Sequence, residues 1–368
     1  MSVQFKFQLA GVAEDEALRT ILRCTPMLGS VSLAFSREPS FFIAEQAGSV
    51  RYQTLICQDQ ETGRVVGIGS RSIRKVYIDG VRKTVGYLSS LRLSPEVRGS
   101  LMLARGYKYL RSLHGDGEVP YYFMTILDEN RYAQQILESG RADLPSHIPI
   151  GALITYLIPL RRKVSYKSRA EVLSDKEDTL PQVHECLSEW NSRYQFAPAY
   201  TLDDISGDTG LLPNFSPKNF YVCKERNKIV GTLGVWNQQS FKQTIVTDYS
   251  ARMRMARPFY NGIARLRGHP TLPNVGGSIR FVHASLVSSE DDDPEVFKWL
   301  IEKACSDWSG CGHDYLLVGL SEGNKLGAVA CRLASRELRS RIYLTHWPED
   351  KAVLPKSERV AHLEVATL

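Results

Sequence analysis

The chain has 368 residues, with 46 Lys or Arg and 40 Asp or Glu, which gives a formal net charge of +6. This mild excess excludes a histone-like polycation and does not require a nucleic-acid partner. Hydrophobic residues make up 43% of the chain and charged residues 23%, as in ordinary globular proteins, so a disordered or collagenous chain is excluded. The length predicts two domains.

Two simple features bear on location. No apolar run approaches the length of a membrane span and the N-terminal stretch has no apolar signal core, so we expect neither a transmembrane helix nor a secretory peptide. The seven cysteines have irregular spacings without a C-x-x-C pair, which indicates free thiols. Cys305, Cys311 and His313 lack an evident fourth ligand, so we expect no metal site. We expect a cytoplasmic protein with no membrane partner.

The first half predicts alternating strands and helices. In chain order, strands are expected at 5–9, 52–58, 65–76, 85–93, 121–127 and 152–158. Helices are expected around Leu18, Ile21 and Leu22, around Leu103, Tyr107 and Leu110, and from 131 to 139. His114 falls on the apolar face of the second helix, where we expect it to be packed.

The second half repeats this plan. Strands are expected near 170–173, 220–224, 228–236, 244–247, 278–287, 315–320 and 341–345, with helices around 183–194, 294–308 and 325–335. Short segments also match in the same order, 63–68 with 227–232 and 121–130 with 315–324. The repeat predicts an N-terminal domain at 1–160, a linker at 161–169, a second domain at 170–350 and a tail at 351–368.

Residues 86–104 predict a strand, a short loop with Arg98 and Gly99, and a helix whose N-terminal N–H groups could bind phosphate. This arrangement resembles the GNAT acyltransferase superfamily, whose Arg-Gly loop binds the pyrophosphate of acetyl-CoA. Asn130, Ala133 and Gly140 match the Asn-x-x-Ala signature of that family. We therefore expect an α/β fold (an α+β mixed sheet) of two tandem GNAT-like acyl-CoA N-acyltransferase domains, of the tandem-domain bacterial type.

The sequence departs from the family pattern in three places. Leu101 and Leu103 stand where the family has small residues, which could narrow the cofactor loop. Leu137 stands where the family often has a general-acid tyrosine. In the second half, the acidic run 288–294 replaces the Arg-Gly loop and would repel a pyrophosphate, so we expect a degenerate domain that does not bind CoA. The stretch 25–39 resembles the substrate-side loop of some bacterial members.

The resemblance implies that the first half, residues 1–160, holds acetyl-CoA. The implied cofactor contacts are Leu91, Arg92, Leu93, Arg98, Gly99, Ser100, Leu101, Met102, Leu103, Asn130 and Ala133. Backbone N–H groups of 91–93 would polarise the thioester carbonyl. The incoming amine must be neutral, so Asp128 and Glu129 are candidate bases, with Tyr87, Ser89 and Thr125 as groups that could hold water. A polar turn before a helix explains Asp128 and Glu129 more simply than a catalytic role.

The predicted function is transfer of an acetyl or other acyl group from acyl-CoA to the amine of a small molecule or peptide. One alternative is a catalytically inactive, CoA-binding or structural protein. A second is an aminoacyl or acyl transferase that acts on a large RNA-linked substrate. The basic stretch of Arg252, Arg254, Arg257, Arg265 and Arg267 would suit this last function, but a solvated face explains it more simply, and we expect no nucleic-acid partner. A homo-oligomer remains open.

Overall fold

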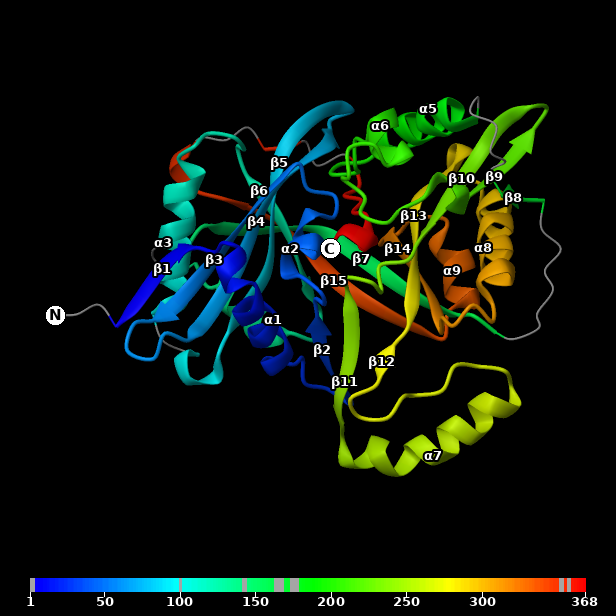
Figure 1. Cartoon of the computed structure of the whole chain (residues 1–368). Coiled ribbons are helices and arrows are strands. Elements are labelled where there is room, and N and C mark those ends of the chain that lie inside the picture. Colours follow the sequence, from blue (N-terminus) through cyan, green and yellow to red (C-terminus); the bar gives the residue numbers. More distant parts are fainter. Residues whose placement is uncertain are drawn as a thin grey trace.

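The computed structural model describes residues 4–98, 101–140, 144–161, 169–172, 179–350, 354–355 and 359–368. These residues form one twelve-stranded sheet that runs through both halves of the chain (Figure 1). In spatial order its strands are β1 (Phe5–Leu9), β3 (Arg51–Asp59), β4 (Val65–Ile78), β5 (Val81–Leu93), β6 (Tyr122–Leu127), β15 (Arg336–His346), β7 (Ser146–Pro159), β14 (Tyr315–Ser321), β13 (Phe281–Ser289), β10 (Lys228–Trp236), β9 (Phe220–Glu225) and β8 (Glu171–Val172).

The two halves of the sheet have corresponding strand orders when they are read from opposite ends of the sheet, and they exchange their last strands. Each half has one parallel pair, β5 with β6 and β13 with β14, among antiparallel neighbours. The strand that ends the second half, β15, lies beside β6 of the first half, and β7 lies beside β14 of the second. The predicted strands are therefore present. However, the final strand of each half, β7 or β15, pairs with a strand of the other half as well as with its exchanged counterpart.

Helices cover both faces of the first half. The apolar stripe of α1 (Asp15–Cys24) packs on Ile56 and Ile68, whereas the stripe of α3 (Met102–His114) packs with Leu55 and Leu88. Adjacent strand residues point to opposite faces, so these two helices lie on opposite sides of the sheet. The short α4 (Arg131–Leu137) follows β6, and the Asn130 side chain accepts a hydrogen bond from the Ala133 N–H, as expected of a helix N-cap.

The second half is built the same way. Phe220 and Val222 of β9 pack with α5 (Thr179–Ser192), while Tyr221 and Cys223 pack with α8 (Pro294–Trp308). The expected N-cap is present, because the Asp293 carboxylate accepts hydrogen bonds from the first turn of α8. The helix α9 (Gly327–Leu333) lies against β7 and β14.

The stretch 25–39 is not simply a loop, because it contains β2 (Val31–Ser36). This strand pairs with β11 (Gln243–Tyr249), which also pairs with β12 (Ser278–Ile279), so a small second sheet joins the two halves. The predicted strand 278–287 is accordingly divided between β12 and β13. The helices α2 (Phe41–Gln46), α6 (Leu202–Ser206) and α7 (Ala251–Leu266) complete the fold.

The described end of the chain, 359–368, packs into the centre of the molecule (Figure 1). Leu363 and Ala366 are buried. The Arg74 guanidinium donates to the Thr367 carbonyl (2.6 Å) and hydroxyl (3.0 Å), and Gln238 Nε2 donates to the Ala366 carbonyl (2.8 Å). We refer to residues 361–368 as the inner tail; it lies where the two halves meet.

Candidate active site

Among the described residues, the middle of β5 pairs with the beginning of the parallel strand β6, at Gly86 with Tyr122 and Tyr87 with Phe123, and the pairing goes no further. Further along, Ser89–Leu93 of β5 and Thr125–Leu127 of β6 both line one cavity of about 550 Å³. Its walls also include α2, α3, β11 and the inner tail. The carboxyl ends of two parallel strands thus open onto a pocket that is large enough for a small-molecule ligand.

A β-bulge marks the edge of this cavity. The register between β4 and β5 shifts between Ile68 and Ser70, and Ser90 has a left-handed backbone with φ of 56°. The second half carries the same feature, with a shift between Thr232 and Gly234 of β10 and a φ of 53° at Leu286 of β13. A bulge turns backbone groups out of the ladder, so each half offers N–H groups at this point.

In the second half, the inner tail occupies the position beside the bulge. The Leu286 N–H donates to Glu364 Oε2 at 2.9 Å. Val365 packs so closely on β14 that a Cβ atom added at Gly319 would lie 2.5 Å from the Val365 Cβ. The expectation that this half does not bind CoA stays a prediction, but the tail supplies a steric reason for it in addition to the acidic run.

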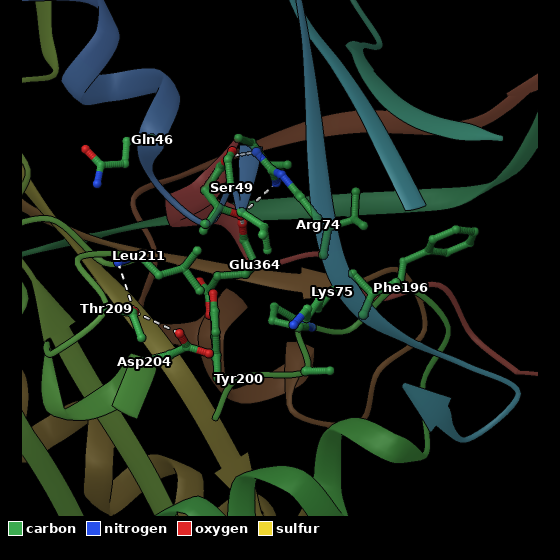
Figure 2. Close-up of a pocket in the computed structure, with 18 of the residues that line it drawn as sticks. Gln46, Ser49, Arg74, Lys75, Phe196, Tyr200, Asp204, Thr209, Leu211 and Glu364 are labelled. Atoms are coloured by element: carbon green, nitrogen blue, oxygen red, sulfur yellow. Dashed lines mark hydrogen bonds between the residues drawn. The ribbon is translucent and has the colours of Figure 1, made fainter. Parts of the chain in front are cut away.

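A second cavity, also of about 550 Å³, lies beside the inner tail (Figure 2). Glu364, Tyr200 and Arg74 line it, and the Thr209 hydroxyl donates to the Asp204 carboxylate at 2.8 Å. Burial raises the pKa of Glu364 to about 7, although hydrogen bonds from backbone N–H groups have the opposite effect on this pKa. The tail therefore places a half-buried carboxylate between the bulge of the second half and this cavity.

One face of α3 forms an apolar wall of the β5–β6 cavity. Met102, Leu103, Gly106, Tyr107 and Leu110 line it at helical spacing. Leu101 is 77% exposed and does not line the cavity, whereas Leu103 does, and the narrowing of the cofactor loop by these two leucines stays a prediction. The predicted contacts Gly99 and Ser100 lie outside the described residues.

Most of the other predicted cofactor residues also belong to the β5–β6 cavity. Leu91, Arg92, Leu93, Asn130 and Ala133 line the cavity. The Arg92 guanidinium lies 5.7 Å from the ring centroid of Phe35, and burial lowers its pKa. Arg98 is exposed, and its Nε donates to the Leu93 carbonyl at 3.2 Å.

The two predicted bases, Asp128 and Glu129, do not line this cavity. The Asp128 carboxylate accepts hydrogen bonds from Arg341 (2.8 Å) and Arg339 (3.0 Å), both on β15. Although desolvation opposes it, these two partners lower the pKa of Asp128. Because a paired carboxylate with a lowered pKa is a poor base, we interpret Asp128 as a link between the halves and Glu129 as an exposed turn residue.

Tyr87 and Ser89 do line the cavity, as predicted from the sequence. The Tyr87 ring lies under the Arg74 guanidinium, 4.0 Å from its centroid, and against Phe123 at 4.8 Å. Burial raises the pKa of Tyr87, so its hydroxyl keeps its proton at neutral pH. His114 is packed, as expected, with Nδ1 3.0 Å from the Tyr122 hydroxyl.

Glu45, which no pattern in the sequence indicated, provides the sole side-chain carboxylate among the described residues that line the cavity. The Ser90 hydroxyl at the bulge donates to Glu45 Oε1 at 2.9 Å. Glu45 lies on α2, a helix of six residues that is too short for its apolar spacing to be recognised. The Ser40 N-cap before it was the available sequence signal.

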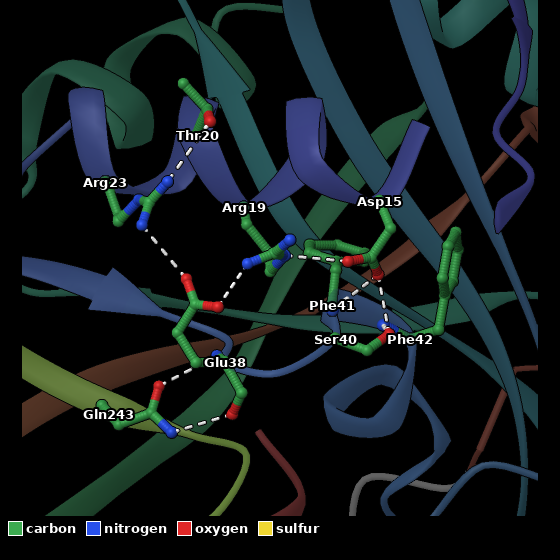
Figure 3. A network of polar contacts seen from close by, with 9 residues as sticks. All are labelled: Asp15, Arg19, Thr20, Arg23, Glu38, Ser40, Phe41, Phe42 and Gln243. Atoms are coloured by element: carbon green, nitrogen blue, oxygen red, sulfur yellow. Dashed lines mark hydrogen bonds and ion pairs between the residues drawn. The ribbon is translucent and has the colours of Figure 1, made fainter. Parts of the chain in front are cut away.

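A polar network fixes α2 in place (Figure 3). The Asp15 carboxylate of α1 accepts hydrogen bonds from the Ser40 hydroxyl (2.7 Å) and the Phe41 N–H (2.9 Å), at the start of α2. Arg19 bridges Asp15 and Glu38. The Gln243 side chain exchanges two hydrogen bonds of 3.0 Å with the Glu38 backbone, so the second half also supports this region.

Lys242, next to β11, is a half-buried amine in the cavity wall. Burial, together with Arg37 and Arg74, lowers its pKa to about 7. Its Nζ donates to the carbonyls of Ala366 (3.2 Å) and Leu368 (3.4 Å). Lys242 thus holds the inner tail against the cavity.

No protein-family model and no curated protein sequence matches the chain. Solved structures do match the chain. N-myristoyltransferase of Saccharomyces cerevisiae with bound myristoyl-CoA is similar over 94% of this chain and 83% of its own, with a TM-score of 0.63 and 12% identity. A GCN5-related N-acetyltransferase from Sphaerobacter thermophilus is similar over 97% of this chain and 99% of its own, with a TM-score of 0.55 and 10% identity.

At these identities the comparisons establish the fold. The chain has the mixed α/β fold of GNAT acyltransferases, as the sequence predicted, and it matches both solved structures over nearly its whole length. The bacterial tandem-domain assignment stays a prediction.

Proposed function

We propose that the chain is an N-acyltransferase that moves an acyl group from acyl-CoA to an amine, with the chemistry in the first half. The observation that carries this proposal is the cavity where β5 and β6 separate, which has a bulge with N–H groups and a carboxylate at its edge. Fold likeness to acyl-CoA-dependent transferases supports it, although fold alone does not define a reaction.

The cavity favours an acyl chain longer than acetyl. Its wall beside α3 is apolar and continues onto the sheet, along Leu55 and Cys57 of β3, Gly67 of β4 and Leu88 of β5. Such a surface gains about 0.8 kcal/mol for each methylene group that it removes from water. An acetyl group would leave most of this wall in contact with water. Acetyl-CoA, the donor expected from the sequence, is therefore the shortest member of the series to test.

The proposed reaction needs three contributions from the chain. Backbone N–H groups at the bulge, from Ser90 to Leu93, polarise the thioester carbonyl and stabilise the oxyanion. Glu45 takes the proton of the attacking ammonium, directly or through one water, because Lys242 is engaged with the tail carbonyls. The amine nitrogen then bonds to the carbonyl carbon and the C–S bond breaks. The thiolate takes the second proton that the nitrogen loses, so CoA leaves as its thiol.

Titration with acetyl-, octanoyl- and tetradecanoyl-CoA by calorimetry tests the donor. We expect affinity to rise about fourfold per buried methylene until the cavity is full. Gly106→Leu projects a side chain into the cavity and should shift the preference to shorter chains. Lys108→Leu, on the exposed side of α3, is the control. Equal affinity for all three donors contradicts a long acyl chain, and absence of binding contradicts the proposal.

Release of free CoA in the presence of an amine panel, followed by chromatography, tests the chemistry. Glu45→Gln should lower turnover at least tenfold with unchanged acyl-CoA affinity, while Asp128→Asn should leave turnover nearly unchanged. If Asp128→Asn lowers turnover and Glu45→Gln does not, Asp128 is the general base instead of Glu45. Acyl-CoA binding without turnover on any amine would favour the inactive CoA-binding alternative, and turnover only on aminoacylated RNA would favour the RNA-linked one.

A further inference from the structure

The excursion that contains α7 is absent from the first half. There, β4 and β5 are joined by the turn Asp79–Gly80. In the second half, the chain between the corresponding strands β10 and β13 instead forms β11, α7 and β12. Figure 1 shows α7 away from the large sheet, connected to it through β11 and β12. β11 supports β2 and α2, but the first half has no counterpart of α7, so we expect a separate role for this helix.

The outer face of α7 is apolar and exposed. Met255, Phe259, Ile263 and Leu266 follow one stripe of the helix and are 71, 77, 53 and 90% exposed, respectively. The inner face is anchored, because Asn261 exchanges hydrogen bonds of 3.0 and 2.8 Å with the backbone of Leu272. Large apolar residues gathered on one side of a rigidly held helix indicate a binding surface.

The charge around this stripe has one sign. Residues 249–289 include six arginines and no Asp or Glu. Arg254 pairs with Asp248 at 2.9 Å, and Arg257 donates to the Leu272 carbonyl, so these two are engaged within the excursion. Within the part of the chain that the structure describes, no carboxylate pairs with the exposed Arg252, Arg265 and Arg267.

We propose that the outer face of α7 binds the surface of an anionic lipid bilayer, with the apolar stripe inserted among the lipids and the three unpaired arginines at the headgroups. A basic amphipathic helix with Phe and Leu on its apolar face has the composition of an interfacial helix. A second copy fits less well, because a symmetric contact would place arginine against arginine. RNA also fits less well, since the centre of the face is apolar.

This surface attachment differs from a membrane span. No helix among the described residues is long and apolar enough to cross a membrane. The sequence-based expectation of no membrane partner considered spans alone, and a helix that lies in the interface needs none. The proposal does not depend on the acyltransferase reaction.

Cosedimentation with vesicles tests it. The probe is vesicles of phosphatidylglycerol and phosphatidylcholine, compared with phosphatidylcholine alone, at low and high salt. We expect binding to the anionic vesicles that weakens with salt. Phe259→Ser with Leu266→Ser should weaken it more than tenfold. Arg252→Gln, Arg265→Gln and Arg267→Gln together should weaken it on the order of a hundredfold, at about fivefold each.

Two controls separate the surface from general effects. Val12→Ser removes an apolar side chain that is 86% exposed elsewhere, and it should bind vesicles like the parent chain. Phe259→Trp should show a blue-shifted emission on vesicles. The proposal is overturned if the parent chain does not bind anionic vesicles, or if Phe259→Ser with Leu266→Ser binds them equally. It is also overturned if that variant merely turns a dimer into a monomer, which would assign the face to a second copy.

Discussion

Glu364 should make the stability of the protein fall as pH rises, and replacing it should remove that fall. Its carboxylate is half-buried beside the bulge of β13 and accepts hydrogen bonds from Leu286 N–H (2.9 Å) and Ala366 N–H (3.4 Å). Burial raises its pKa from 4.5 to about 7. Between these values the folded chain holds a proton that the unfolded chain has released. Stability is therefore lost as pH rises from 4.5 towards 7.

The magnitude follows from the size of the shift. At 1.36 kcal/mol per pKa unit, the loss attributable to Glu364 approaches about 3 kcal/mol above pH 7. This is an upper value, because one side of Glu364 borders a cavity that can hold water. Glu364→Gln imitates the protonated form. It should match the parent chain at pH 4 and be more stable than the parent chain at pH 8.

Urea denaturation at a series of pH values measures this difference. Buried His147 and His362, whose pKa values burial lowers to about 4, act in the opposite direction, since they reduce stability as pH falls below 6.5. They are present in both chains, so the difference between parent and Glu364→Gln isolates Glu364. If the two chains show the same pH dependence, the carboxylate is solvated and the reasoning is wrong.

Three further predictions concern support of the fold and site. Asp116→Ala leaves the fully buried Arg71 without a charged partner and should cost about 3 kcal/mol of unfolding free energy, measured in urea. Asp15→Ala removes the contacts that hold the start of α2, and it should lower turnover several-fold while acyl-CoA affinity, measured by calorimetry, stays the same. Arg98→Glu places a negative charge beside α3 and should weaken acyl-CoA binding about tenfold, whereas Arg226→Glu, at the exposed turn between β9 and β10, should not.

Local periodicity predicted most strands and helices, because the spacing of apolar residues depends on which face of an element is buried. The α8 stripe and the Asp293 cap are examples, since both signals lie within a few residues of each other. The strand β2 was missed although Val31–Ser36 alternates between half-buried and buried residues. Its partner β11 is two hundred residues away, and no local pattern identifies a partner.

The site was partly predictable for the same reason. Tyr87, Ser89, Arg92 and Asn130 line the cavity because the motif that indicated them lies on the two strands that form it. Glu45 comes from a different element, and its approach to Ser90 depends on how α1 and β11 hold α2. Tertiary contacts of this kind leave no spacing in the sequence.

The exchange of final strands leads to a last prediction. β15 of the second half lies between β6 and β7, and β7 lies between β15 and β14, so separating the halves would expose long unpaired strand edges. Fragments divided within the predicted linker, 161–169, should each be insoluble alone. Coexpressed, they should associate and bind acyl-CoA like the whole chain. A soluble first fragment with a cooperative urea transition of its own would contradict this reasoning, because each half would then close its own sheet.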